Sequence, residues 1–275
     1  MNWLTGLFDD GSGVREPDAT TEFETELFTT LVKPRPCDRI LDCGSGEGRL
    51  ARALAARGQT HVSGVEQTDY SFGRAKRLAL RQGLNVSFSK ADPRHCPFAD
   101  ESFDAVAMLG ESFARPNDVR QDTAAIAEAL RLLRPSGQFV LGVADGNWRR
   151  KHYQPDSVEI LADGFIYRRT ELSADRDRLI THELVAEQAR GVSTERVTVE
   201  RLYGALEITD LLRRAGFDGI SICHGMPFQP ASADEAKKGA PRLYASARAP
   251  ASRRQMIFPR PVSRSRPSLT LSQAS

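Results

Sequence analysis

Residues 39–50 read RILDCGSGEGRL, and this stretch decides the expected fold. A short apolar strand ends on Asp42, and glycines follow at three alternate positions up to Gly48. The apolar residues between Leu50 and Leu54 then begin a helical pattern. A strand, a glycine turn and a helix N-terminus together form a site where the backbone can approach a ligand closely.

The spacing of the glycines separates two classes of ligand. The dinucleotide fingerprint has the form G-x-G-x-x-G, in which the third glycine packs the helix against the strand. Here that third position is Arg49, the spacing is G-x-G-x-G, and a carboxylate stands at the strand end. An anionic residue so close to the turn suits a ligand with an ammonium group better than a pyrophosphate. A nicotinamide-dependent enzyme is therefore disfavoured.

The segment LDCGSGEGRL resembles the first motif of class I S-adenosylmethionine-dependent methyltransferases. The resemblance implies that the glycine turn packs against the methionine part of the cofactor and that the acid helps to place its amino group. On this basis S-adenosylmethionine is the expected cofactor. The expected cofactor-binding residues of this segment are Asp42, Cys43, Gly44, Ser45 and Gly46.

A second short strand, HVSGVE at residues 61–66, also ends on an acid. A carboxylate in the position of Glu66 can accept hydrogen bonds from both ribose hydroxyls of an adenosine. Both cofactor classes use this device, so Glu66 supports an adenosine ligand without choosing between them. Gln67 follows and is expected to reach the same ribose, whereas a solvated acid at a strand end is the structural alternative.

Further passages extend the resemblance over about a hundred residues. It implies that Asp92 and Pro93, after a third strand, line the adenine side. The segment CPFADESFDAV is similar to the family's passage into the fourth strand, and LRPSG and LRRAGF are similar to later family motifs. The resemblance also implies that the fourth strand opens onto the reacting methyl group at Leu109, Gly110 and Glu111.

The expected architecture is a Rossmann-like α/β fold. It has a seven-stranded, mostly parallel sheet with helices on both faces, and an antiparallel β insertion after the fifth strand. We expect a methyltransferase domain over residues 37–250, in which the insertion at 151–203 forms the substrate wall. Three insertion strands are predicted, at 165–172, 179–187 and 196–203, because polar turns separate them.

Residues 1–36 are predicted to form a helical segment over the active site, and packing on the sheet is the alternative. Within it, Glu22–Val32 is amphipathic. The apolar residues predicted to share its buried face are Phe23, Leu27, Phe28 and Leu31.

Bulk properties indicate a soluble globular protein. Of the 275 residues, 40% are hydrophobic and 27% charged, which is ordinary for this class. No apolar run reaches the roughly 20 residues needed to span a bilayer. The first residues lack the features of a secretory signal, so we expect a cytoplasmic protein without a membrane partner. No two of the four cysteines have C-x-x-C spacing, so no metal site is expected.

The charge distribution bears on partners. Residues 251–275 contain five arginines and no acids, so the net charge of +2 leaves −3 on residues 1–250. An acidic body does not indicate a nucleic-acid surface. The arginine-, proline- and serine-rich tail at 251–275 is expected to be disordered. A small-molecule acceptor is the expected partner, and a homodimer formed through the antiparallel insertion is a further expectation.

The implied chemistry is methyl transfer by in-line displacement, because the methyl group of a sulfonium is already electrophilic. The protein then positions the acceptor and excludes water, and a base removes a proton where the acceptor carries one. The candidate bases are His182, His152 and Tyr203. Two other functions stay open: an RNA or protein methyltransferase that uses the tail, and a cofactor-binding fold retained as a non-catalytic partner module.

Overall fold

The protein is described by a computed structural model that covers residues 19–110, 113–114, 118–187, 191–225 and 241–252. Two sheets account for its strands: one has seven strands in the order β10-β11-β5-β4-β1-β2-β3, and the other has four in the order β6-β7-β8-β9. The strands of the large sheet are β1 (Arg39–Cys43), β2 (His61–Glu66), β3 (Val86–Lys90), β4 (Phe103–Met108), β5 (Leu133–Ala144), β10 (Asp218–His224) and β11 (Arg242–Arg248).

The large sheet is parallel except for β11. Strand β1 lies in its interior, with Ile40 opposite Val62 of β2 on one side and Ala105 of β4 on the other. Strand β11 runs antiparallel to both β5 and β10. The predicted seven-stranded, mostly parallel sheet is therefore confirmed, and the carboxyl ends of β1, β2 and β4 meet at one edge.

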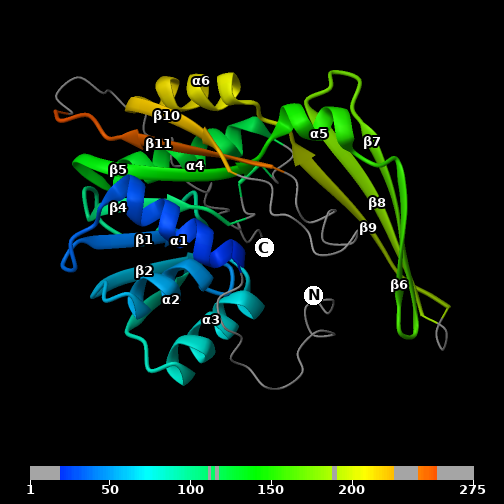
Figure 1. Cartoon of the computed structure of the whole chain (residues 1–275), viewed down its shortest axis with the longest axis horizontal. Coiled ribbons are helices and arrows are strands. Elements are labelled where there is room, and N and C mark those ends of the chain that lie inside the picture. Colours follow the sequence, from blue (N-terminus) through cyan, green and yellow to red (C-terminus); the bar gives the residue numbers. More distant parts are fainter. Residues whose placement is uncertain (1–18, 111–112, 115–117, 188–190, 226–240, 253–275) are drawn as a thin grey trace, which may run out of the picture.

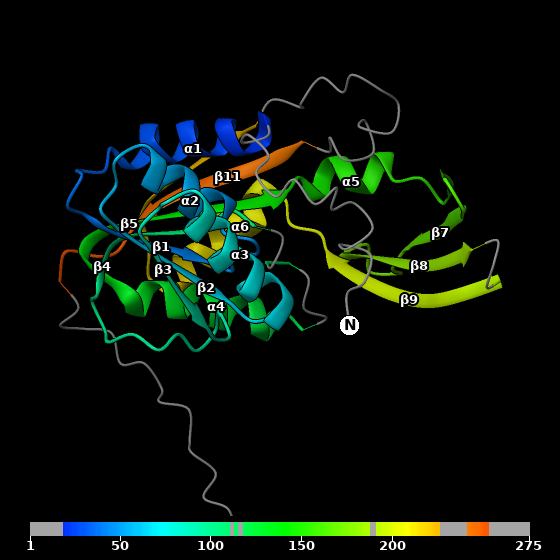
Figure 2. The same ribbon diagram turned by 90° about the horizontal axis from the view of Figure 1, so that it is seen from below.

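Helices cover both faces of this sheet (Figure 2). Helices α1 (Ala19–Val32), α2 (Arg49–Ala56) and α3 (Asp69–Arg81) lie on one face, and α4 (Val119–Leu132) and α6 (Ala205–Ala215) lie on the other. Each face has its own apolar cluster, one built around Phe28 and Ile40 and the other around Leu41 and Phe139. Ile40 and Leu41 point to opposite faces, as successive residues of a strand must.

Helix α1 buries a different face from the predicted one. Phe28 is fully buried, but Phe23 is 38% exposed, and Glu24 and Thr25 are buried instead. The prediction was wrong about Phe23 because it counted only apolar residues. Glu24 can face the interior because partners from α2 and β11 satisfy its carboxylate.

The sequence also missed or misplaced some elements. Helices α3 and α5 (Gly146–His152) were not predicted, although Thr68 and Asp145 cap them through side-chain oxygens. Helix α4 ends at Leu132, and β5 begins directly at Leu133. Pro135, in the LRPSG segment, therefore lies inside the first part of β5.

The antiparallel insertion has four strands rather than the predicted three. They are β6 (Asp156–Leu161), β7 (Gly164–Leu172), β8 (Arg178–Glu187) and β9 (Gly191–Arg201). Strand β6 was missed because its apolar residues, Val158 and Ile160, are few and exposed, so burial gives it no strong pattern. Figure 1 shows this sheet beyond α5, on the side of the molecule where β5 ends.

Several predictions concern residues that the structure does not describe. Residues 1–18 of the N-terminal segment, Glu111, and nearly all of the tail at 251–275 lie outside the described ranges. Within those ranges, no helix is long and apolar enough to cross a membrane.

The turn before α2 requires glycine for a steric reason. Gly48 has a φ of 72°, and a Cβ atom there would lie 2.5 Å from the ring of Phe88. We expect Gly48→Ala to lower the free energy of unfolding by about 2–4 kcal/mol, from backbone strain and overpacking together. Urea unfolding followed by circular dichroism measures the change.

Gly58→Ala is the matched control, because Gly58 has a φ of 94° but no atom within 4 Å of an added Cβ. Gly58→Ala should lower the free energy of unfolding only by the cost of backbone strain at positive φ. Equal destabilisation by the two substitutions would contradict the steric role of Gly48.

Candidate active site

The glycine turn is fastened to the end of β2. The backbone N–H groups of Gly44 and Ser45 both donate to the carbonyl oxygen of Val65, each at 2.9 Å. Gly44 and Gly46 have φ values of 75° and 55°, in the left-handed region that glycine adopts without strain. The turn thus folds back over the carboxyl ends of β1 and β2.

The glycine turn is open to a ligand at Gly46 but closely packed where Gly110 approaches it. A Cβ atom on Gly46 would meet nothing within 4 Å, whereas one on Gly110 would lie 2.7 Å from the carbonyl oxygen of Gly44. The hydroxyl of Ser45 is buried and has no hydrogen-bond partner among the described residues. An open cradle beside an unsatisfied hydroxyl fits a ligand that contacts the turn at van der Waals distance.

Asp42 is a buried carboxylate at the bottom of this cradle. Among the described residues its one hydrogen bond comes from the backbone N–H of Ala51, at 3.3 Å. Burial raises the pKa of Asp42 to about 7, against the opposing effect of the nearby Arg49 guanidinium, and Glu24 and Glu66 add to the rise. A buried carboxylate with so little compensation suits a cationic ligand.

Glu66 ties the turn to the start of α3. Its Oε2 accepts a hydrogen bond from the backbone N–H of Gly46 at 3.0 Å. Its Oε1 accepts from both the backbone N–H and the hydroxyl of Thr68, at 2.9 and 2.8 Å. These contacts orient the carboxylate at the edge where the sequence predicts a ribose. Gln67, next in the chain, is exposed.

The loop after β3 lies against the end of β1. The Cys43 thiol is buried, 3.7 Å from the carbonyl oxygen of Pro93 and 3.9 Å from the Cys96 sulfur. Arg94 binds both carboxylate oxygens of Asp92, and this pairing holds the pKa of Asp92 below its ordinary value. If Asp92 binds an adenine amino group, its carboxylate therefore binds that group and Arg94 at the same time.

The end of β4 completes the edge. Leu109 is buried, and its carbonyl oxygen accepts a hydrogen bond from Arg242 of β11 at 3.1 Å. Gly110 is the residue in close approach to the glycine turn. The structure therefore brings Asp42, Glu66 and Leu109 to one edge of the sheet.

The three candidate bases do not converge. Tyr203 donates its hydroxyl hydrogen to Asp122 at 2.7 Å, and burial together with that carboxylate raises the pKa of Tyr203 far above its usual range. His152 ends α5, where its ring stacks on Trp148. His182 is exposed in the middle of β8, opposite Val197 of β9.

Two groups of polar residues at this edge were missed from the sequence. Asp145 caps α5, and its other oxygen lies 3.6 Å from the ring of His224 at the end of β10. Glu24, Arg242 and Tyr244 meet beside Arg49, the residue that follows the glycine turn. No short motif marks either group, because its members are far apart in the sequence, although the residue type at the start of α5 is that of a helix cap.

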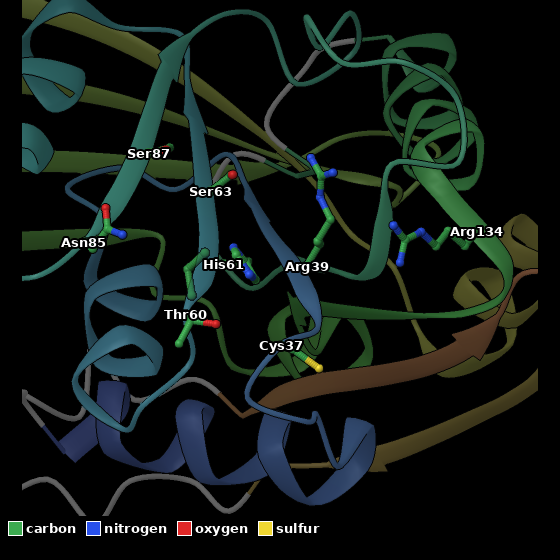
Figure 3. Close-up of a pocket in the computed structure, with 9 residues that line it drawn as sticks. Cys37, Arg39, Thr60, His61, Ser63, Asn85, Ser87 and Arg134 are labelled. Carbon is green, nitrogen blue, oxygen red and sulfur yellow. The ribbon is translucent and has the colours of Figure 1, made fainter.

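A separate hollow of about 430 Å³ lies at the opposite, amino edge of β1, β2 and β3 (Figure 3). Arg39, His61 and Arg134 contribute to its lining, and Arg134 pairs there with Asp104 at 2.7 Å. None of the predicted site residues lines it. In the part of the chain that the structure describes, no three histidine, cysteine, aspartate or glutamate side chains form a metal-binding group.

Comparison with known proteins agrees with this geometry. Residues 40–137 match the family described as "Methyltransferase domain". The chain is 32% identical over 139 residues to 27-O-demethylrifamycin SV methyltransferase of Amycolatopsis mediterranei, a match that covers 50% of this chain and 49% of that protein. The chain spans about half or less of the length of the first curated relatives that it matches.

Solved structures share the fold over most of the chain. The CcbJ methyltransferase of Streptomyces caelestis superposes with a TM-score of 0.67 at 16% identity, covering 90% of this chain and 96% of that one. CalS10, an amino pentose methyltransferase of Micromonospora echinaspora solved with S-adenosylmethionine bound, gives a TM-score of 0.59 at 19% identity, with the same coverage. Residues 40–137 are thus similar to a methyltransferase domain, and the chain shares its fold with solved S-adenosylmethionine-dependent methyltransferases.

Proposed function

We propose that the protein transfers a methyl group from S-adenosylmethionine to a small-molecule acceptor by in-line displacement. The observation that carries the proposal is the buried carboxylate of Asp42 beside the open cradle at Gly46. When bound, S-adenosylmethionine supplies an electrophilic methyl group on a sulfonium. The protein supplies charge complementarity and a fixed geometry, which lower the barrier by positioning rather than by a covalent intermediate.

Each predicted cofactor residue has a role in this proposal. Asp42 holds the ammonium group, and the methionine part lies on Gly44, Ser45 and Gly46, where the Ser45 hydroxyl gains a partner. Oε2 of Glu66 accepts one hydrogen bond, from Gly46, and can accept another, whereas Oε1 already accepts two from Thr68; the free acceptor position on Oε2 supports the assignment of Glu66 to a ribose hydroxyl.

The remaining predicted residues line the other parts of the cofactor. Cys43 packs beneath the turn, and Gln67 lies beside the ribose. Asp92 and Pro93 flank the adenine, and Leu109 and Gly110 lie beside the methyl group; Glu111, also expected there from the sequence, lies outside the described residues.

The acceptor is proposed to be a small molecule because the relatives named above act on a rifamycin and an amino pentose. The insertion of residues 151–203 is the proposed wall of the acceptor pocket, since its sheet lies on the side where β5 ends (Figure 1). The cytoplasm is the proposed location.

Among the candidate bases, the contacts favour His152 and His182 over Tyr203, whose hydroxyl already donates to Asp122. Comparing the rates of His152→Gln and His182→Gln variants in an acceptor assay distinguishes the two.

A homodimer through the insertion is proposed on the basis of an apolar sheet face. Ile160 lies opposite Phe165, Phe165 opposite Ala186, and His182 opposite Val197. Because His182 and Ala186 are four residues apart on one strand, Ile160, Phe165 and Val197 share one face of the four-stranded sheet. Ile160 is 78% exposed and Val197 57% exposed. A second copy of the same face is a self-complementary partner, as a twofold interface requires.

Cofactor binding is tested by titration calorimetry at pH 8 with S-adenosylmethionine, S-adenosylhomocysteine and NAD. We expect micromolar binding of the first two and none of NAD. Asp42→Asn and Glu66→Gln should each weaken binding at least tenfold, because each removes a carboxylate that the ligand uses. Glu47→Gln, in the same turn but paired outward with Arg74, should bind normally. Binding of NAD without binding of S-adenosylmethionine or S-adenosylhomocysteine would contradict the proposal.

The free protein should show the cost of burying Asp42. In the unfolded chain its carboxyl group ionises near its ordinary pKa of 3.8, whereas in the folded chain it keeps its proton to about pH 7. Between these values the folded state binds more protons, so the free energy of unfolding falls as pH rises. Asp42→Asn should therefore be about 2–4 kcal/mol more stable than the wild type at pH 8 and equal to it at pH 3.5.

Urea unfolding at the two pH values measures this difference. A variant that was less stable than the wild type at pH 8 would contradict the assignment of Asp42 as an uncompensated buried carboxyl group.

The oligomeric state is tested by size-exclusion chromatography with light scattering. The wild type should elute at about twice the chain mass of 30.4 kDa. The double substitution Ile160→Lys and Val197→Lys should give a monomer with unchanged circular dichroism, because it places charges in the apolar interface. Leu206→Lys, equally exposed but on α6, is the control that should remain dimeric. A monomeric wild type would exclude the interface.

A further inference from the structure

Glu24 is the most deeply buried acid of helix α1, with a side chain that is 0% exposed. Its carboxylate contacts three groups from two other elements. Arg49, the first residue of α2, donates to Oε2, and the Tyr244 hydroxyl of β11 donates to Oε1 at 2.9 Å. The Arg242 Nε, also on β11, lies 3.5 Å from Oε1. A buried carboxylate is tolerated only when such partners compensate it.

Both arginines connect Glu24 to residues of the expected cofactor site. Arg49 directly follows Gly48 of the glycine turn, and its charge acts on Asp42. Arg242 donates from Nη2 to the carbonyl oxygens of Leu109 and Gly142, at 3.1 and 3.0 Å. One carboxylate therefore connects the turn that receives the methionine part with the end of β4.

We propose that Glu24 is a positioning residue of the cofactor site, which acts through Arg49 on the carboxylate of Asp42 and through Arg242 on the end of β4. The proposal rests on the assignment of Asp42 to the cofactor site. Glu24 itself lies outside the matched residues 40–137 and does not touch the cofactor in the proposed arrangement.

The physical reason is competition for one guanidinium. Glu24 (α1), Arg49 (α2) and Glu66 (β2) are the charged groups that act on Asp42, and Tyr244 and Arg242 (β11) complete the surroundings of Glu24. While Glu24 holds Arg49, the guanidinium compensates Asp42 only in part, and the carboxylate stays available to an ammonium group. If Glu24 is neutral, Arg49 is released toward Asp42, which then ionises more easily but is already paired.

Removing either partner should therefore shift the pH dependence of binding in opposite directions. Glu24→Gln takes away a repelling carboxylate and frees Arg49, so Asp42 ionises at lower pH. Arg49→Met takes away the cation, so Asp42 ionises at higher pH. A loss of packing alone would weaken binding in both variants without moving the two profiles apart.

The experiment is titration calorimetry with S-adenosylhomocysteine between pH 5.5 and 8. Wild-type affinity should rise about tenfold from pH 6 to pH 8 as Asp42 ionises. Glu24→Gln should bind about tenfold more weakly at pH 8 and change less than about twofold over the same range. Arg49→Met should show its rise at higher pH than the wild type.

Glu22→Gln is the matched control. Glu22 lies on the same helix and pairs with Arg57, but the pair is exposed, so its profile should equal that of the wild type. Melting curves establish whether each variant is folded. If Glu24→Gln does not fold, the pH profile of Arg49→Met still tests the proposal.

Wild-type binding with parallel pH profiles in wild type and folded variants would overturn this proposal alone. Failure of the wild type to bind S-adenosylhomocysteine at any pH would overturn the cofactor assignment together with it.

Discussion

The burial of one carboxylate, Asp42, is the constraint on which the active edge of this protein depends. Strand β1 is an interior strand of the large sheet, between β4 and β2, and its last residues are buried. A carboxylate at that point loses hydration that a single backbone hydrogen bond at 3.3 Å does not replace. The free protein therefore carries a local cost that a cationic ligand can remove, which links the stability of the fold to the occupancy of the site.

The surroundings of Asp42 explain the unusual composition of helix α1. A helix that only covered the sheet would bury apolar side chains, yet α1 places Glu24 in the interior and leaves Phe23 partly exposed. Because Glu24 binds groups from α2 and β11, the helix is joined to the glycine turn by charge as well as by the packing of Phe28. Helix α1 thus contributes, through Glu24, to the charged groups that surround Asp42.

Much of the architecture was predictable because local patterns and tertiary structure agree. Strands β1, β2 and β4 are buried over most of their length, and the glycines at 44, 46 and 48 adopt positive φ. The convergence of Asp42 and Glu66 follows from parallel strands whose carboxyl ends share an edge. These features need only the sequence near each residue.

The rest depends on contacts between distant segments. Glu24 and Tyr244 are 220 residues apart, and Asp122 and Tyr203 are 81 apart, so no periodicity shows that either acid would be buried. Strand β6 pairs with β7 through the backbone while its apolar side chains stay exposed, which removes the usual signal. The candidate bases failed to converge for the same reason: a histidine's neighbours are set by the fold and not by its motif.

The crystal structure of the protein with S-adenosylhomocysteine tests the central claim most directly. We predict that the amino acid end of the ligand lies over Gly44–Gly46 with its amino group directed to Asp42, and that the ribose lies beside Glu66. A ligand bound elsewhere, or a glycine turn occupied by a ligand whose amino group points away from Asp42, would contradict that claim.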